Sequence, residues 1–263
     1  MQRIHPTAVI EEGAVIGDNV TVGPYAYITS QVKIGNGTTI ASHALIEGKT
    51  TIGENNRIFS HAVVGSIPQD LKFDGEDVEL IIGNGNTIRE FTLINPGTIG
   101  GGAITRIGDD NLLMGYVHVG HDVIIGNRCI LANATNLGGH VEIGNHTVIG
   151  AMSAVHQFVK LGDYSMLAGA SALTQDLPPY CMAEGNRATL RGLNLTGLRR
   201  HIDRESINEL KSTYKVLFEQ GKALQDVVKN YLEESDSSVV ININKFIQNS
   251  KRGIPYTRKI NVK

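Results

Sequence analysis

Two histidines and an aspartate stand close together near the middle of this sequence, within "MGYVHVGHDVIIGNRC", residues 114–129. His118 and His121 are three residues apart, Asp122 follows directly, and glycines flank the group. Residues of these types can bind a metal ion, pair a general base with the carboxylate that orients it, or form a polar surface without chemistry. The backbone that carries them decides between these three possibilities.

An aliphatic residue recurs every six positions along most of the chain. The repeat runs from Ile4 to Val64, resumes from Ile82 to Ile94, and continues after a one-residue slip from Ile107 to Leu173. Glycine often follows the aliphatic residue, where we expect it to tolerate the dihedral angles of a corner. A period of six fits neither a helix at about 3.6 residues per turn nor a plain strand at about two. It predicts an all-β solenoid, a parallel β-helix of about ten coils that ends near residue 178.

The composition suits thin layers better than a conventional core, because the 263 residues include 30 glycines, no tryptophan and 5% aromatics. The formal net charge of -2 gives no indication of a nucleic-acid or membrane-surface binder. Cys129 and Cys181 form no CxxC pair, which is typical of a reducing compartment. The sequence shows no signal peptide and no long apolar run. We therefore expect a cytoplasmic protein without stable membrane insertion and without a nucleic-acid partner.

Two segments break the rhythm of six. "SIPQDLKFDGEDVE", residues 66–79, is polar, and "NPGTIGGGAITR", residues 95–106, is rich in glycine and contains the slip. Insertions in a solenoid tend to gather on its binding face, although either segment could be a tolerated surface loop. We expect both segments to leave the solenoid as loops.

After about residue 185 the apolar pattern becomes helical. Asp203 is a plausible N-cap and Gly221 a plausible stop for a first helix, and two further helices are expected within residues 222–235 and 237–253. The sequence thus predicts a β-helix over residues 1–185, with a loop inserted at 66–79, and a small helical domain over residues 186–263. Such a domain can cover one end of the solenoid, where unpaired strand edges would otherwise invite aggregation.

The repeat resembles that of the hexapeptide-repeat family of left-handed parallel β-helices, in which three hexads make one coil of 18 residues. The resemblance, and not the period, implies the left-handed sense. On such a coil residue i lies beside residue i+18, so Gly139 stacks on His121 and His140 on Asp122. The same rule predicts that one corner gathers the following residues: Gly120, His121, Asp122, Gly138, Gly139, His140, His156 and Gln157.

A histidine beside an open slot lined by backbone N–H groups suits an acyl transfer. In such a layout the base takes a proton from the attacking hydroxyl, and a backbone N–H stabilises the oxyanion that forms. Two other interpretations stay open on the residues alone. The histidines could have only a structural role at the corners, or they could form a zinc site like that of the hexapeptide-repeat carbonic anhydrases, a class of zinc-dependent hydro-lyase.

Longer motifs resemble one family of hexapeptide-repeat acyltransferases: "NLLMGYVHVGHDVIIGNRCILAN", "GGHVEIG", "AVHQF", "QDLPPY", "QDLKF" and "GLNLTGLRR". They are similar to the acyl-carrier-protein-dependent UDP-N-acetylglucosamine acyltransferases of lipid A synthesis, nearly end to end. The resemblance implies transfer of a 3-hydroxyacyl chain from acyl carrier protein to the 3-position of UDP-N-acetylglucosamine. It also implies a homotrimer, and no cofactor and no metal beyond the phosphopantetheine arm of the carrier.

The resemblance implies roles for individual residues. His121 becomes the general base, Asp122 orients its ring, and the Gly139 amide stabilises the oxyanion. The implied substrate-binding residues are Gln69, Asp70, Lys72, Asn95, His118, His140, His156, Gln157, Gly169, Asn194 and Arg200. Among these, Gln69, Asp70 and Lys72 contact sugar and pantetheine, Asn194 and Arg200 hold the nucleotide, and Gly169 leaves a long groove for the acyl chain.

This sequence departs from the better-known members at three positions. It reads "INPGT" where they read "IHRGT", so Asn95 replaces a histidine near the sugar. Thr196 stands in place of a glutamate and His201 in place of an arginine. The amide oxygen of Asn95 can accept a hydrogen bond from the extra N–H of a 3-amino sugar. We therefore predict that the 3-amino analogue is accepted at least as well as the hydroxyl sugar. The alternative is that Asn95 only fits a tighter turn beside Pro96.

Overall fold

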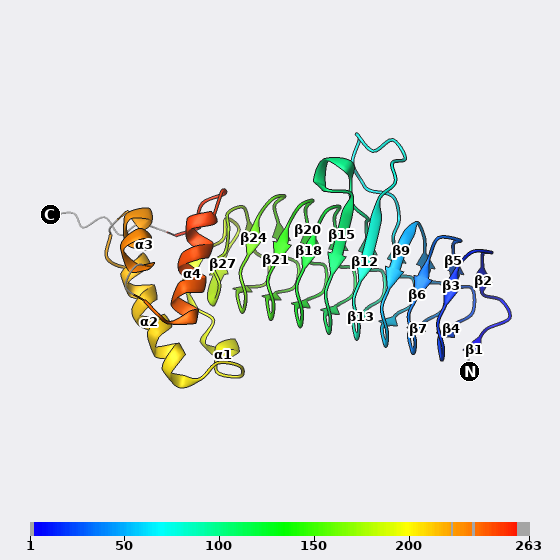
Figure 1. The fold of residues 1–263 in the computed structure, drawn as a ribbon, viewed down its shortest axis with the longest axis horizontal. Helices are drawn as coiled ribbons and strands as arrows, with labels where there is room; N and C mark the ends of the chain where they lie inside the picture. The colour runs from blue at the N-terminus through cyan, green and yellow to red at the C-terminus, as the bar shows by residue number, and fades with distance from the viewer. Residues whose placement is uncertain (1–2, 222, 233–234, 257–263) are drawn as a thin grey trace.

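Short strands wind around one axis in the described part of the chain, which comprises residues 3–221, 223–232 and 235–256 of this computed structural model. Each coil contributes one strand to each of three sheets, so strands from successive coils become neighbours (Figure 1). The pairing is parallel up to the last pair of the largest sheet, which is antiparallel. The repeat of six residues therefore produces the β-helix predicted from it.

The first sheet has 11 strands: β1 (Arg3–Ile4), β4 (Thr21–Val22), β7 (Thr39–Ile40), β10 (Arg57–Ile58), β13 (Thr87–Ile88), β16 (Leu112–Leu113), β19 (Ile130–Leu131), β22 (Val148–Ile149), β25 (Met166–Leu167), β27 (Cys181–Glu184) and β28 (Thr189–Leu193). The second sheet has 9 strands: β2 (Val9–Ile10), β5 (Tyr27–Ile28), β8 (Leu45–Ile46), β11 (Val63–Val64), β14 (Leu93–Ile94), β17 (His118–Val119), β20 (Asn136–Leu137), β23 (Ala154–Val155) and β26 (Ala172–Leu173). The third sheet has 8 strands: β3 (Val15–Ile16), β6 (Lys33–Ile34), β9 (Lys49–Ile52), β12 (Glu79–Ile82), β15 (Ile104–Ile107), β18 (Ile124–Ile125), β21 (Glu142–Ile143) and β24 (Lys160–Leu161).

Most coils pair in the register of 18 residues, as Val119 beside Leu137 illustrates. Two coils are longer. Ile58 lies beside Ile88, and Ile88 lies beside Leu113, because each of these coils contains one insertion. The sheets thus continue without interruption past both insertions.

The inward-facing aliphatic residues form the core and are almost fully buried, as at Ile94 (0% exposed) and Leu137 (1%). The burial of each such side chain contributes about 1.5–3 kcal/mol relative to exposure. The first coil is the exception, because no earlier coil stacks on it and Ile4 is 42% exposed.

The glycine that follows the aliphatic residue is needed for a different reason from the one we expected. Neither Gly35 nor Gly126 has a φ in the left-handed region, but a Cβ on Gly35 would lie 2.6 Å from the carbonyl carbon of Gly53 in the next coil. Residues with side chains occupy the left-handed corner positions, including Asp122 (φ 59°) and His140 (φ 61°). The glycines therefore permit the close approach of successive coils, and the expectation about corner dihedrals was wrong.

Both insertions leave the solenoid at the same edge, between the second and third sheets. The first covers residues 65–78 and ends one residue earlier than predicted, because Glu79 begins β12 and pairs with Lys49. The second contains the 3-10 helix η1 (Ile99–Gly101), and β15 already begins at Ile104. The two insertions project together from one side of the solenoid (Figure 1).

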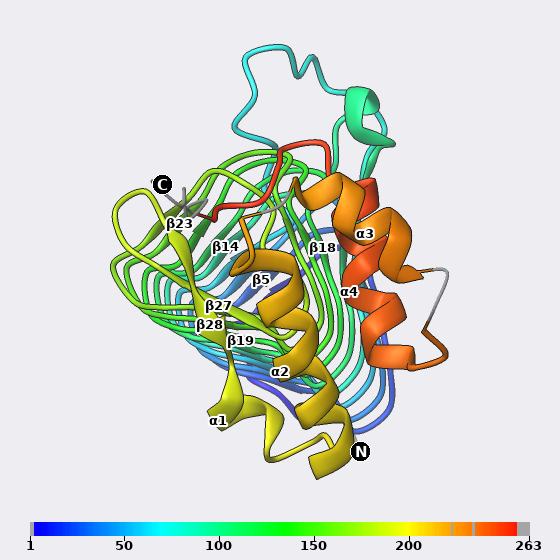
Figure 2. The same cartoon turned by 90° about the vertical axis from the view of Figure 1, so that its left-hand side faces the viewer.

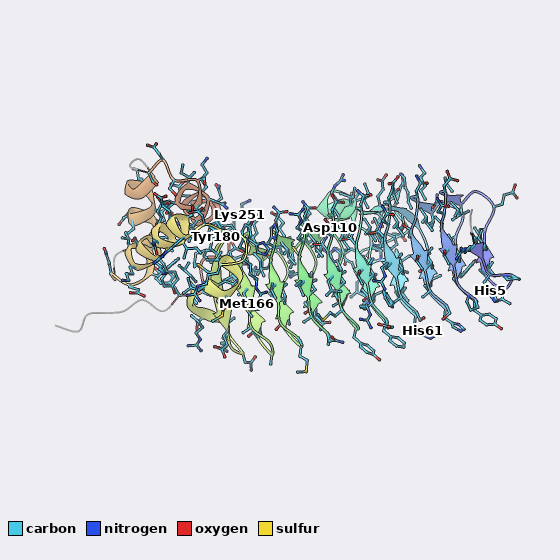
Figure 3. All side chains as sticks on the ribbon, turned by 90° about the horizontal axis from the view of Figure 1, so that it is seen from below. His5, His61, Asp110, Met166, Tyr180 and Lys251 are labelled. Carbon is cyan, nitrogen blue, oxygen red and sulfur yellow. The ribbon has the colours of Figure 1, made fainter. Side chains whose placement is uncertain are left out.

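Three edges run along the solenoid where the chain turns from one sheet to the next. The edge with the insertions is called here the histidine edge, and its corners in three successive coils are His121–Asp122, Gly139–His140 and Gln157–Phe158. The edge between the third and first sheets is called the tyrosine edge, and it carries His146, Tyr164 and Tyr180. On the third edge, between the first and second sheets, stacked rings include His61 (Figure 3).

Helices follow the solenoid and cover its last coils (Figure 1, Figure 2). They are α1 (Leu195–Leu198), α2 (Arg204–Phe218), α3 (Leu224–Leu232) and α4 (Ser238–Asn249). Asp203 caps α2 as predicted, because its side chain accepts a hydrogen bond from the Ser206 N–H at 2.9 Å. The strand β28 and the short helix α1 were not predicted.

The predicted boundary at residue 185 falls in the turn between β27 and β28, so the division into two domains stays a prediction. Residues 222, 233–234 and 257–263 of the predicted helical domain, and residues 1–2 of the predicted β-helix, lie outside the described residues. Within the described chain, each helix is too short or too polar to cross a lipid bilayer.

Candidate active site

A paired histidine and aspartate stand at the histidine edge. The Nδ1 atom of His121 lies 2.8 Å from Oδ2 of Asp122, and the aspartate side chain is 1% exposed while the histidine side chain is 17% exposed. Because an ionised carboxylate only accepts hydrogen bonds, His121 Nδ1 donates, and in the neutral ring the other nitrogen, Nε2, has the lone pair. A base with an available lone pair is thus oriented by a buried acid.

Gly139 lies beside the His121 ring in the next coil. A Cβ on Gly139 would lie 2.6 Å from Nε2 of His121 and 2.5 Å from Cε1, so only glycine fits beside the ring in this position. Among the described residues, the Gly139 N–H has no hydrogen-bond partner. The i+18 rule placed these two residues side by side, and the structure brings them together.

His140 and Phe158 extend the group along the same edge. The His140 ring meets the His121 ring edge-on at 5.0 Å and stacks on Phe158 at 4.3 Å. Its Nε2 lies 3.8 Å from Asp122 Oδ2. Burial lowers the pKa of His140 below its usual range, and His121 acts in the same direction while Asp122 and Asp70 oppose it. Phe158 was not predicted, although it follows His140 by 18 residues and the same rule would have found it.

His118 and Asn95 link this edge to the first insertion. His118 Nε2 lies 3.2 Å from Asn95 Oδ1, while the Asn95 amide donates to the carbonyl oxygens of Ser66 (2.9 Å) and Ile67 (3.0 Å). Because the Asn95 oxygen only accepts, His118 Nε2 carries the proton of this contact. Burial also lowers the pKa of His118. Asn95 is 1% exposed, so in this arrangement its oxygen faces His118 and not open solvent.

A cavity of about 270 Å³ lies between the insertions and the histidine edge. Its lining includes Asp70 and Lys72 from the first insertion, Thr98 from the second, and His140 with Phe158 from the edge. Asp70 and Lys72 therefore lie around the same cavity as His140. Gln69 is exposed on the insertion and does not line this cavity.

Two predicted residues of the same edge do not join the group. His156 and Gln157 are both exposed. The Nδ1 atom of His156 accepts a hydrogen bond from Nη2 of Arg252 at 2.9 Å, which ties this corner to the segment after α4. That contact joins residues 96 positions apart, so no local pattern could have predicted it.

The predicted nucleotide and acyl residues lie on other edges. Asn194 caps α1 and donates to the Tyr164 carbonyl oxygen at 3.0 Å, and exposed Arg200 directly follows α1 and its C-cap, at the tyrosine edge. Gly169 is exposed at a corner between the first and second sheets. The helix α1 lies on the side opposite to the insertions (Figure 2). Within one chain these residues do not converge on His121.

Three titratable residues at the histidine edge lie close enough together for a metal site to be considered. One ligand atom from each of His121, Asp122 and His140 lies within 4.8 Å of the others. However, Oδ2 of Asp122 already accepts hydrogen bonds from His121 and from Thr98 Oγ1, and Oδ1 accepts one from the Thr98 N–H. Donors that point at both oxygens favour a carboxylate held as a hydrogen-bond acceptor over one held as a metal ligand.

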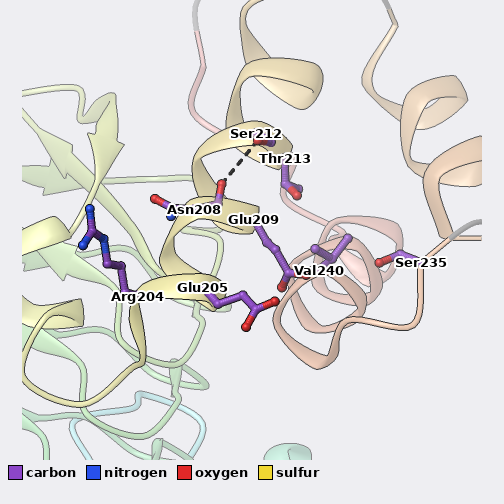
Figure 4. A pocket seen from close by; sticks show the side chains of 8 residues that line it. All are labelled: Arg204, Glu205, Asn208, Glu209, Ser212, Thr213, Ser235 and Val240. Carbon is purple, nitrogen blue, oxygen red and sulfur yellow. Dashed lines mark hydrogen bonds between the residues drawn. The ribbon is translucent and has the colours of Figure 1, made fainter.

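A larger cavity, of about 710 Å³, opens between α2 and α4 and contains none of the predicted site residues (Figure 4). Its walls are mostly polar side chains of α2, such as Asn208, Glu209 and Ser212. The group at the histidine edge therefore remains the candidate active site, because it alone of the two combines a base, its orienting acid and a backbone donor.

Comparisons with known proteins agree along nearly the whole chain. Residues 176–255 match the family model described as Udp N-acetylglucosamine O-acyltransferase, Domain 2, and residues 3–30, 13–48 and 104–139 match the bacterial transferase hexapeptide model. An acyl-[acyl-carrier-protein]–UDP-N-acetylglucosamine O-acyltransferase of Sulfurovum sp. is 68% identical over 98% of this chain and 100% of its own length. The corresponding protein of Sulfurimonas denitrificans is 72% identical over 98% of this chain and 99% of its own length.

Solved structures agree as well. A UDP-N-acetylglucosamine acyltransferase from Campylobacter jejuni has a TM-score of 0.94 and 49% identity, and the alignment covers 97% of this chain and 100% of that one. The predicted fold class is confirmed: a left-handed parallel β-helix of hexapeptide repeats followed by a small helical region.

Proposed function

This chain belongs to the UDP-N-acetylglucosamine O-acyltransferase family and is an acyltransferase, and on that basis we propose that it transfers a 3-hydroxyacyl chain from acyl carrier protein to the 3-position of UDP-N-acetylglucosamine in lipid A biosynthesis. We place this reaction in the cytoplasm. The acyl group arrives on the phosphopantetheine arm of the carrier, and the reaction uses no further cofactor and no metal.

The proposed chemistry is a direct attack on the thioester. His121 Nε2 takes the proton of the sugar 3-hydroxyl as its oxygen bonds to the thioester carbonyl carbon. The negative charge that develops on the carbonyl oxygen is stabilised by the Gly139 N–H. The carbon–sulfur bond then breaks, and the pantetheine sulfur leaves as a thiol with the proton from His121. Asp122 stabilises the imidazolium between the two proton transfers.

One arrangement carries this proposal: Gly139, whose N–H has no hydrogen-bond partner among the described residues, lies against the His121 ring, where a Cβ would be 2.6 Å from Nε2, while Nδ1 lies 2.8 Å from Oδ2 of buried Asp122. Base and oxyanion donor thus lie next to each other on adjacent coils, where one reacting carbonyl can meet both.

We further propose that the enzyme is a homotrimer and that each site uses two chains. The insertions at the histidine edge expose Ile67 (69%), Leu71 (107%) and Ile99 (64%), which is apolar surface suited to a neighbouring copy. Asn194 and Arg200 at the tyrosine edge lie far around the solenoid from His121. A neighbour whose tyrosine edge faces the histidine edge supplies these residues to the nucleotide.

The test is a transfer assay with purified acyl carrier proteins charged with 3-hydroxyacyl chains of several lengths. We expect formation of the acylated UDP-sugar and a loss of about 10²–10⁴-fold in kcat for His121→Ala. A folded His121→Ala protein that keeps more than about a tenth of the wild-type kcat contradicts the base assignment. Absence of transfer with every carrier, together with stoichiometric zinc in elemental analysis, supports a zinc-dependent hydro-lyase instead. The Gly169→Met protein is assayed alongside, because a filled groove shifts the preference to shorter chains.

A further inference from the structure

The carboxylate of Asp122 is enclosed by the second insertion. Thr98 donates to it twice: its backbone N–H lies 2.9 Å from Oδ1, and its hydroxyl Oγ1 lies 2.6 Å from Oδ2. Thr98 itself is 7% exposed. From the other side, the Asp122 N–H donates to the hydroxyl of Thr105 at 2.8 Å. Within the described part of the chain, every hydrogen bond to the two carboxylate oxygens thus comes from Thr98 or from His121.

The insertion is folded tightly around this contact. The Thr98 carbonyl oxygen accepts from the N–H groups of Gly101 (2.9 Å) and Ala103 (2.8 Å), which closes the turn of η1. A Cβ on Gly101 would lie 2.0 Å from Cγ of Asp122 and 2.3–2.4 Å from its oxygens. The turn therefore lies directly against the carboxylate, and Thr98 is held in place by backbone hydrogen bonds that do not depend on its side chain.

The hydroxyl of Thr98 and the ring of His121 share one oxygen atom. Both donate to Oδ2, and the hydroxyl contact is the shorter one, at 2.6 Å against 2.8 Å. A second donor on the same oxygen withdraws charge from it and fixes the plane of the carboxylate, and both effects act on the proton and the direction of the imidazole. The side chain of Thr98 thus influences His121 through a single shared atom, Oδ2 of Asp122.

We propose that Thr98 is a positioning residue for the acyl transfer, which acts through Asp122 to hold His121 with Nδ1 protonated and Nε2 aimed at the reacting hydroxyl. This inference rests on the proposed role of His121 as the general base. It assigns a task to the second insertion, which brings a hydroxyl from the preceding coil to a carboxylate that the regular corner leaves open on that side.

The matched variants are Thr98→Val, which replaces the hydroxyl with a methyl group of similar shape, and Thr98→Ser, which keeps the hydroxyl and removes a methyl group. We expect Thr98→Val to lower kcat by about 10–100-fold with KM changed less than about threefold, since a misdirected base affects the chemical step more than binding. Thr98→Ser is expected to keep at least about a third of the wild-type kcat.

The pH profile separates positioning from a merely structural effect. The ionisable groups that face His121 are Asp122, His118 and His140, with Asp70 acting on His140. The Thr98→Val substitution replaces none of these ionisable groups. With one donor fewer, Oδ2 holds the imidazolium more strongly, so the acid limb of kcat/KM is expected to move to higher pH in Thr98→Val and to stay in place in Thr98→Ser.

The results that overturn this inference differ from those that overturn the proposed function. Wild-type transfer that is lost in His121→Ala but undiminished in Thr98→Val, with an unshifted acid limb, overturns this inference and leaves the proposed function intact. No transfer by the wild-type enzyme overturns the proposed function. If Thr98→Val does not fold, as judged by thermal melting, Thr98→Ala takes its place with the same measurements. An NMR resonance of the His121 Nδ1 proton that is unchanged in that variant also counts against the inference.

Discussion

At the scale of single residues, burial of His118 and His140 favours the neutral form of their rings. The pKa of His118 is lowered by burial and by nearby His121, and the pKa of His140 is lowered mainly by burial. A neutral imidazole both donates and accepts hydrogen bonds, so each ring can serve a sugar or an amide without repelling the imidazolium that forms on His121.

Stability should therefore depend on pH in a definite direction. Because His118 and His140 have lower pKa values in the folded than in the unfolded chain, the unfolded chain binds more protons below the ordinary value of 6.5. The two histidines therefore make their full contribution to stability above pH 6.5. As the pH drops from 6.5 towards their lowered pKa values, the free energy of unfolding falls. Denaturant titrations at several pH values between about 5 and 8 measure this fall, and a His140→Gln protein is expected to show a shallower slope. An equal slope in the His140→Gln protein would show that His140 does not cause the pH dependence of stability.

The acceptor sugar is a second question at this scale. The Asn95 oxygen contacts His118, so any effect of residue 95 on the sugar passes through that ring. Held with Nε2–H towards Asn95, His118 keeps Nδ1 as an acceptor for the extra N–H of a 3-amino sugar. We expect kcat/KM for the 3-amino sugar to equal or exceed kcat/KM for the hydroxyl sugar. The Asn95→His substitution is expected to reduce the preference for the 3-amino sugar. A strong wild-type preference for the hydroxyl sugar removes the idea.

At the scale of elements, the second insertion and the histidine edge act as one unit. Gly101 lies against the Asp122 carboxylate, whereas a Cβ on its neighbour Gly100 would meet nothing within 4 Å. The two glycines are thus a matched pair in one turn. Gly101→Ala is expected to lower kcat by at least about tenfold, because the added methyl group displaces either the carboxylate or the turn, while Gly100→Ala leaves kcat within about twofold. Steady-state kinetics of the two proteins decide this, and equal behaviour of both would mean that the turn moves aside freely.

The elements also explain what the sequence could and could not predict. The repeat of six places Gly139 beside His121 and His140 beside Asp122, because regular coils convert sequence distance into spatial distance. It is equally able to place Phe158 on His140. The rule stops at the insertions, where no period exists, and so the contacts of Thr98 with Asp122 were beyond it. The Arg252 contact of His156 was also out of reach, since it depends on how the helices fold back.

At the scale of the whole molecule, the residues proposed for the site are distributed over different edges of one solenoid. His121 and Asp122 lie on the histidine edge, and Asn194 and Arg200 lie on the tyrosine edge. In the proposed trimer, two edges from different chains meet in each site. Function then depends on the assembly even though every chain folds its own core.

Mixed oligomers test this arrangement. His121→Ala and Arg200→Ala proteins, each weakly active alone at low sugar concentration, are expected to regain about a quarter of wild-type activity when co-expressed in equal amounts, because random mixing gives that share of sites with both residues intact. The control mixes His121→Ala with Asp122→Ala, whose defects lie on the same edge, so no site becomes intact. Failure of the first mixture to exceed this control, with mixed oligomers confirmed by mass spectrometry, would show that one chain supplies both residues.

The uneven coil lengths also determine how a single chain yields to mechanical force. Each coil contacts only its neighbours, and the first coil has no cover, so tension applied from the N-terminal side should peel the solenoid one coil at a time. A regular coil frees ~60 Å of contour length at about 3.4 Å per residue. The coils that span Ile58 to Ile88 and Ile88 to Leu113 free ~100 Å and ~85 Å. The extension trace of this protein should thus contain two steps longer than the others, and these steps come from the coils whose insertions border the candidate active site.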